Sequence, residues 1–189
     1  MLPLESAAAI VDLPVAPAVI GDTGGRRDSH NESRVFFAGQ LLADHAVCRD
    51  VVACFQSAET VAALQQATGA VLEGCFLRIE YCQDRGGFWL EPHTDIGAKK
   101  FTMLVYLSDA PDAGNWGTDI YDGAKRPAGR APADFDQGLV FIPAGDTWHG
   151  FEPRPIDGIR RSFIVNYVSP AWLARHELAC PDRPVTIRI

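Results

Sequence analysis

The spacing of hydrophobic positions changes along this chain at about residue 70. Between residues 38 and 69 the apolar side chains recur about every 3.6 residues, which is typical of helices with one buried face. Within this region Ser57 is a candidate N-cap, with Glu59 in the first turn after it, and Gly69 suits a C-terminal stop. The pattern therefore predicts helices over 38–69.

From residue 71 onward, short runs rich in β-branched and aromatic residues alternate with turn-forming stretches. The candidate strands are VLEGCFLRIEYC, KKFTMLVYLS, GTDIYD, GLVFIP, TWHGFE and RRSFIVNYV. Several short strands at this spacing indicate an antiparallel sandwich or jelly roll over residues 71–168. The expected fold class is mainly β with flanking helices.

The two ends of the chain differ in character from this core. A short helix is expected around Glu5–Val11, and the polar, glycine-rich stretch 21–34 makes the N-terminal segment 1–34 partly flexible in our interpretation. Near the other end, SPAWLARHEL (169–178) predicts a closing helix, with a serine cap followed by proline at the first helical position. A length of 189 residues suits a single domain, 1–189, that contains all of these parts.

The composition limits which binding partners and which cellular compartment we expect for this protein. The formal net charge is −7, which argues against nucleic acid or an anionic membrane as the main partner, because clustered Lys and Arg drive binding to both. No secretory signal and no long uncharged apolar run are evident. The five cysteines form no CxxC pair and suit reduced thiols. We expect a cytoplasmic protein without a membrane partner, and a homodimer only as the commonest assembly.

A candidate metal site stands just before the apolar run FTMLVYL. His93 and Asp95 are two residues apart, and in an extended segment such side chains point the same way. A third ligand is expected from a distant strand. His149 begins a late candidate strand, whereas the other histidines lie in the polar N-terminal stretch or in predicted helices. The predicted metal ligands are therefore His93, Asp95 and His149.

Two histidines and one carboxylate occupy one face of an octahedral ion and leave the other face open, as in non-haem Fe(II) oxygenases. The same three ligands also suit Zn²⁺ with a bound water, which would make the protein a metal-dependent hydrolase or lyase. A non-catalytic module that binds a metal or a small molecule is a third interpretation.

Downstream, Arg160 and Ser162 share one face of a predicted strand, and Arg161 points the other way. A guanidinium beside a hydroxyl is a good receptor for a carboxylate, because arginine binds it through two parallel charge-assisted hydrogen bonds. 2-Oxoglutarate could chelate the metal at one end and be held here at the other. Alternatively, Arg160 forms a structural ion pair with Glu80 or Asp119.

The order His93-x-Asp95, His149, Arg160-x-Ser162 resembles the 2-oxoglutarate/Fe(II)-dependent dioxygenases, most of all their prolyl-hydroxylase-like branch, over about residues 72–170. The resemblance implies a double-stranded β-helix, a cupin-like jelly roll, with helices on one side. It implies an enzyme that uses Fe(II), 2-oxoglutarate and O₂ to hydroxylate a substrate, with release of succinate and CO₂.

The resemblance also extends to single positions. Tyr106 matches a tyrosine that hydrogen-bonds the distal carboxylate of 2-oxoglutarate, and Tyr81 matches one that lines the same pocket. Trp116 stands where members often have one glycine of a Gly-Gly pair, and the loop 123–137 is peculiar to this chain. Both departures fall near the expected substrate entrance. The resemblance therefore specifies the substrate only as a small molecule or a protein side chain. Lys99 and Lys100 are expected at a solvated strand start.

Overall fold

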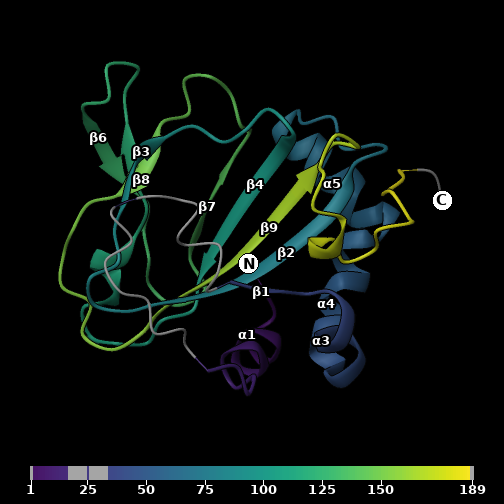
Figure 1. Cartoon of the computed structure of the whole chain (residues 1–189), viewed down its shortest axis with the longest axis horizontal. Helices are drawn as coiled ribbons and strands as arrows, with labels where there is room; N and C mark the ends of the chain where they lie inside the picture. Colours follow the sequence, from purple (N-terminus) through teal and green to yellow (C-terminus); the bar gives the residue numbers. More distant parts are fainter. Residues whose placement is uncertain (1, 17–24, 26–33, 188–189) are drawn as a thin grey trace.

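The computed structural model describes residues 2–16, 25 and 34–187. Two antiparallel sheets form its centre (Figure 1): one has the strand order β1-β2-β9-β4-β7, and the other β3-β8-β5-β6. The strands are β1 Val35–Phe36, β2 Phe76–Asp84, β3 Leu90–His93, β4 Lys99–Tyr106, β5 Asp119–Tyr121, β6 Pro127–Arg130, β7 Gly138–Phe141, β8 His149–Phe151 and β9 Arg160–Val168. The predicted mainly β class is confirmed. Strand β6 lies in the stretch expected to be a loop.

Helices pack on one face of the five-stranded sheet. They are α1 Leu4–Val11, α3 Gly39–Asp44, α4 Ala46–Gln56 and α5 Ala58–Thr68. Two short 3-10 helices lie outside this group, η1 Ala113–Trp116 and η2 Arg175–Glu177, and η1 packs against Phe88 and Phe151. The helices predicted over 38–69 are confirmed. Ser57 caps α5 by accepting a hydrogen bond from Thr60 N at 3.2 Å, and Gly69 ends it with φ +76°. The expected polar stretch 21–34 lies almost wholly outside the described residues.

The two faces of the larger sheet have opposite characters. In β2 and β9 the odd-numbered residues, such as Ile79, Phe163 and Val165, join the apolar core under the helices. The even-numbered residues of both strands point to the other side, between the two sheets, because successive side chains of a strand alternate. The strands are direct antiparallel neighbours, so Cys82 lies opposite Ser162 and Asp84 opposite Arg160. This face carries the polar side chains of the site.

The predicted closing helix over 169–178 is replaced by an irregular segment that contains only η2. Trp172 and Leu178 are both buried against Val168. Six residues at 100° each would place these two side chains on different faces of a helix, so a helix could not bury both on one neighbour. The backbone then returns to the large sheet, where Ala179 N donates to Leu77 O at 3.0 Å.

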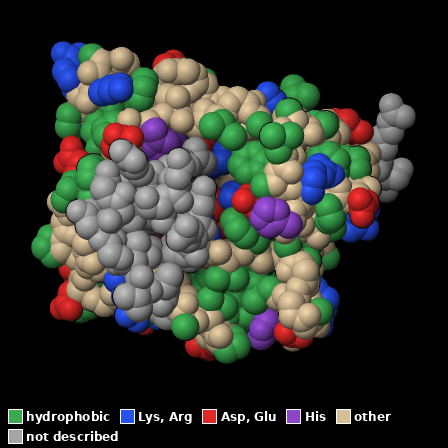
Figure 2. Space-filling model, viewed as in Figure 1, with side chains coloured by type: hydrophobic (Ala, Val, Ile, Leu, Met, Phe, Trp, Pro, Cys, Tyr) green, Lys and Arg blue, Asp and Glu red, His purple; other side chains and the backbone are tan. Residues whose placement is uncertain are grey.

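Charged side chains of both signs are interspersed on the face shown in Figure 2, where no large area of a single sign stands out. Within the described residues no helix is both long and apolar enough to cross a membrane.

Candidate metal centre

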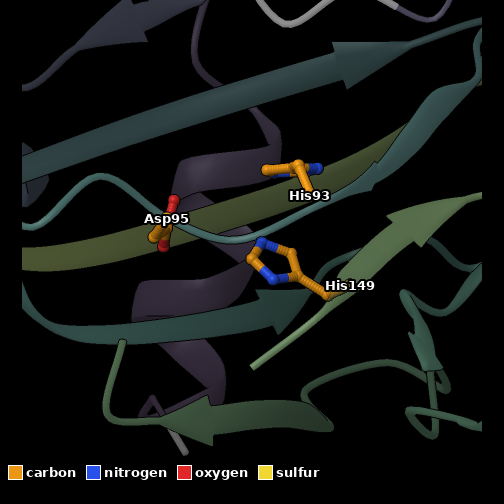
Figure 3. Close-up of side chains that lie close together, drawn as sticks. All are labelled: His93, Asp95 and His149. Atoms are coloured by element: carbon orange, nitrogen blue, oxygen red, sulfur yellow. The ribbon is translucent and has the colours of Figure 1, made fainter. Parts of the chain in front are cut away.

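His93, Asp95 and His149 come together at neighbouring points of the smaller sheet (Figure 3). His93 ends β3, His149 begins β8, and these antiparallel strands place the two residues directly opposite each other. Their ring centroids are 4.3 Å apart. Asp95 follows two residues after β3, and the potential ligand atoms of the three side chains all lie within 4.8 Å of one another. In the part of the chain that the structure describes, no other such group of His, Cys, Asp and Glu side chains occurs.

Hydrogen bonds to the backbone set the tautomer of both rings. Nδ1 of His93 lies 2.9 Å from Glu91 O, and Nδ1 of His149 lies 2.9 Å from Thr147 O. A carbonyl oxygen only accepts, so each Nδ1 carries the proton. Nε2 is then the nitrogen that can ligate a metal ion, in the arrangement that metal-binding histidines usually have.

The Asp95 carboxylate is held from two sides. Lys99 Nζ donates to Oδ1 at 2.9 Å, and Thr102 Oγ1 lies 3.0 Å from Oδ2. Thr102 Oγ1 also lies 3.0 Å from Asn166 Oδ1, so its single proton is shared between two acceptors. These contacts fix a carboxylate oxygen beside the two imidazoles. The donor set, two neutral nitrogens and one oxygen anion, fits Fe(II) as well as other divalent first-row metals.

The three side chains line a cavity of about 70 Å³. Its other walls come from the inner face of the large sheet and from β8. Formal charges balance among the lining residues, since three basic side chains face three acidic ones: Arg34, Lys99 and Arg160 against Glu80, Asp84 and Asp95. A cavity of this kind can bind ions without carrying a net charge of its own.

Arg160 lines this cavity, and Ser162 lines it beside Arg160. The guanidinium is buried, with Nε donating to Trp116 O at 2.7 Å and Nη1 to Asp84 Oδ2 at 2.5 Å. Its Cζ atom lies 4.7 Å from the ring centroid of Phe151 and 5.5 Å from that of Phe88. The alternative of a structural ion pair is thus realised, but with a carboxylate other than Glu80 or Asp119.

The two tyrosines take other positions than the resemblance implied. Tyr106 packs its ring 5.6 Å from Arg160 Cζ, but its hydroxyl donates to Thr118 Oγ1 at 2.8 Å and accepts from Thr118 N at 2.9 Å. Tyr81 faces the helices and belongs to the apolar core, outside the cavity. Burial raises the pKa of the Tyr81 hydroxyl to about 12. Neither hydroxyl is placed to bind a ligand in the cavity.

The prediction that Lys99 and Lys100 stand at a solvated strand start is wrong for Lys99. Lys99 is buried in the cavity, whereas Lys100 is exposed. The register of β4 against β9 shifts between Lys99 and Phe101. Strict alternation from Thr102 would turn Lys100 inward, and the shift turns Lys99 inward instead. Sequence alternation alone would therefore place Lys100, and not Lys99, in the cavity. Asp84, also missed, follows Glu80 and Cys82 at the strand spacing of two and could have been found by extending that pattern.

A buried ion network borders the cavity around Glu80. Arg34 Nη1 and Arg78 Nη1 each lie 2.6 Å from a Glu80 oxygen, and Asn166 Nδ2 donates to Oε1 at 3.2 Å. Burial alone would raise the pKa of Glu80, but the two guanidinium groups outweigh it and hold that pKa far below its usual range. Asn166 also contacts Thr102, so this network connects to the group that holds Asp95.

No family model matches the sequence, and no curated protein matches it either. Among solved structures, it is similar to a Pseudomonas putida prolyl-4-hydroxylase, with 15% identity, a TM-score of 0.59, and coverage of 90% of this chain and 85% of that one. It is also similar to a viral collagen prolyl hydroxylase of Paramecium Bursaria Chlorella virus-1 in a 2OG complex, with 12% identity, a TM-score of 0.57, and coverage of 89% and 92%.

A third similar structure is HygX from Streptomyces hygroscopicus with nickel and 2-oxoglutarate bound. The identity is 15% and the TM-score 0.51, with coverage of 91% of this chain and 88% of that one. At these identities the likeness concerns the fold. The structural resemblance to prolyl hydroxylases and related 2-oxoglutarate oxygenases, expected from the sequence, is therefore confirmed at the level of the fold.

Proposed function

We propose that this protein is a 2-oxoglutarate- and Fe(II)-dependent oxygenase. The observation that carries the proposal is that one cavity holds both a two-histidine, one-carboxylate group and a buried arginine, on the fold of known oxygenases of this class. A zinc-type hydrolase would need the first group alone. The arginine gives the cavity a second anchor, which suits a co-substrate with a carboxylate at each end.

The strand order supports a double-stranded β-helix. Strands β2, β4, β7 and β9 belong to the larger sheet, while β3, β5, β6 and β8 form the smaller one. The chain thus crosses repeatedly between two facing layers, as in a jelly roll. In this arrangement the two histidines come from β3 and β8, Asp95 follows β3, and the anchoring arginine comes from β9.

In the proposed site His93, Asp95 and His149 would hold Fe(II), which supplies oxidising chemistry when bound together with 2-oxoglutarate and O₂. The two imidazoles would bind through Nε2, because their Nδ1 protons are held by backbone carbonyls. Arg160, with Ser162 beside it, would bind the distal carboxylate and so orient the co-substrate along the cavity. The aromatic rings around Arg160 would keep water from this contact.

Charge supports the same assignment. The lining residues are formally neutral in sum, and a divalent ion together with a dianionic co-substrate leaves that balance unchanged. A divalent ion with a neutral ligand would leave two positive charges in a partly buried space, which is costly. The substrate would be a small molecule or a protein side chain that is hydroxylated while 2-oxoglutarate is converted to succinate and CO₂.

The proposal is tested by measuring succinate formed from 2-oxoglutarate by the purified protein with Fe(II) in air. We expect formation that depends on the protein and falls to background in the Asp95→Ala variant. Equal succinate formation by wild type and Asp95→Ala would contradict the proposal. Metal binding by the wild type without any consumption of 2-oxoglutarate would instead favour the hydrolase or the non-catalytic binding module.

A further inference from the structure

Asp84 and Arg160 form a buried ion pair at the end of the cavity. The side chains are 1% and 6% exposed, and Asp84 Oδ2 lies 2.5 Å from Arg160 Nη1. Asp84 is the last residue of β2 and Arg160 the first residue of β9, and the two are paired in register. The arginine that would anchor the co-substrate therefore already holds a carboxylate of the protein itself.

The contacts of Arg160 limit how a second carboxylate can bind. A guanidinium can donate two parallel hydrogen bonds to one carboxylate. It does so along one of two edges, through Nε and Nη2 or through Nη1 and Nη2. Trp116 O accepts the single proton of Nε on the first edge, and Asp84 Oδ2 accepts one of the two protons of Nη1, a nitrogen of the second edge. An incoming carboxylate that forms two parallel bonds therefore meets Trp116 O on one edge and the Asp84 carboxylate beside the other.

Of the two partners, Asp84 is the one that can move. Trp116 contributes a backbone carbonyl from η1, and its side chain is 1% exposed within the cluster that contains Phe88 and Phe151. Asp84 contributes only a side chain, at the point where β2 gives way to a turn containing Gly86 and Gly87. Gly87 has φ +92°, so this turn uses backbone conformations that other residues rarely adopt.

We propose that Asp84 is an internal competitor for the co-substrate's distal carboxylate, and that binding exchanges one carboxylate for the other on Arg160. This inference rests on the proposed function. Two carboxylates in contact with the same guanidinium would repel each other at short range in a partly buried space, so the exchange is favoured over joint binding. Asp84 thereby weakens the binding of 2-oxoglutarate, while a 2-oxo acid that lacks a distal carboxylate leaves the pair intact.

The test compares two 2-oxo acids in two proteins. 2-Oxoglutarate and 2-oxopentanoate share the metal-chelating end and the five-carbon chain, but the second ends in a methyl group. Dissociation constants are measured anaerobically with Fe(II) for wild type and Asp84→Asn. We expect Asp84→Asn to bind 2-oxoglutarate about tenfold tighter or more, which corresponds to about 1.4 kcal/mol, and to bind 2-oxopentanoate as the wild type does.

Two further variants serve as controls for this comparison. Asp122→Asn makes the same change of net charge at a carboxylate that pairs with exposed Arg126, and should leave both dissociation constants unchanged. Asp84→Ser is a second neutral variant, for use if Asp84→Asn does not fold.

A thermal unfolding scan gives an independent readout. 2-Oxoglutarate should raise the unfolding temperature of the neutral variant by more than that of the wild type, since it replaces the missing partner of Arg160.

Each other outcome has a definite meaning. If wild type binds 2-oxoglutarate and the neutral variants bind it equally or more weakly, the competitor role is overturned while the proposed function stands. Equal tightening of both 2-oxo acids would also overturn it, because the effect would not lie at the distal end. If neither wild type nor the variants bind 2-oxoglutarate, the proposed function fails together with the inference.

Discussion

Lys99 donates a hydrogen bond from Nζ to Oδ1 of Asp95 across 2.9 Å, with side chains that are only 5% and 2% exposed. An ammonium group therefore lies directly against the carboxylate that completes the candidate metal centre. A divalent ion on Asp95 would share this carboxylate with Lys99, and like charges repel strongly in a space from which water is largely excluded. The metal affinity of the site should reflect this repulsion.

We expect Lys99→Met to bind a divalent metal about tenfold more tightly than wild type, because it removes the ammonium charge and keeps the length of the side chain. The metal-free variant should also be less stable, since Asp95 loses a buried partner. Competition between the protein and a chelator for Zn(II) measures the affinity, and thermal unfolding measures the stability.

Lys100→Met is the matched control. Lys100 is exposed, and its Nζ donates to Gly97 O, so this variant makes the same change of charge outside the cavity. Its metal affinity should equal that of the wild type. Weaker metal binding by Lys99→Met than by Lys100→Met would contradict the repulsion and indicate that Lys99 mainly holds Asp95 in its ligating position.

Gly150 allows β3 and β8 to approach each other beside the metal centre. A Cβ atom at this position would lie 2.7 Å from Leu90 O and 3.1 Å from Glu91 O. Gly150→Ala should therefore push apart the strands that carry His93 and His149, lowering the free energy of unfolding by about 1–3 kcal/mol and weakening metal binding. Chemical denaturation and Zn(II) titration measure the two effects.

Gly129→Ala in β6 of the same sheet provides the comparison, because a Cβ atom there meets nothing within 4 Å. This substitution should change stability and metal affinity little. If Gly150→Ala behaved like Gly129→Ala, the close packing of β3 on β8 would not be what holds the two histidines together.

Glu80→Gln tests the buried ion network. Burial raises the pKa of Glu80, but the two guanidinium groups outweigh it and hold this pKa far below its ordinary value of 4.5. Above that value the carboxylate is charged in the folded and the unfolded chain, so its stabilisation is fully present. As the pH falls below it, the unfolded chain takes up a proton that the folded chain does not, and the free energy of unfolding decreases.

The variant should be less stable than wild type by about 3–5 kcal/mol at neutral pH, because two buried guanidinium groups lose their shared carboxylate. Its stability should also fall less steeply than that of wild type between about pH 5 and pH 3. Urea unfolding across this pH range measures both. Glu59→Gln, at an exposed position in the first turn of α5, is the control and should leave the pH dependence of stability unchanged. If the stability of Glu80→Gln fell as steeply as that of wild type, the lowered pKa of Glu80 would not explain the pH dependence.

Local patterns in the sequence were sufficient for most of the helices and strands and for the three residues of the candidate metal centre. Apolar spacing separated the helical region from the strands, and the short His93-x-Asp95 spacing, with His149 at a strand start, marked three side chains that the sheet brings together. These signals are local or rest on the rarity of histidine in the chain. They do not depend on how the strands pair.

Features that depend on strand pairing could not be predicted. Alternation along β2 separates Tyr81 from Asp84, but only the register of β2 on β9 shows that Asp84 lies opposite Arg160. Lys99 enters the cavity because of a register shift in β4, which leaves no mark in the pattern of hydrophobic residues. The prediction of a helix over 169–178 was wrong for a similar reason. Burial of Trp172 and Leu178 against Val168 outweighed the local signals for a helix.

The most direct test is an anaerobic titration of metal-free protein with Fe(II) and then 2-oxoglutarate, recorded by visible absorption. The proposed function predicts an iron-to-ketoacid charge-transfer band that is absent in His93→Ala and needs more 2-oxoglutarate to develop in Arg160→Ala. Tight metal binding by wild type without such a band would contradict the account and leave a zinc-type hydrolase or a binding module in its place.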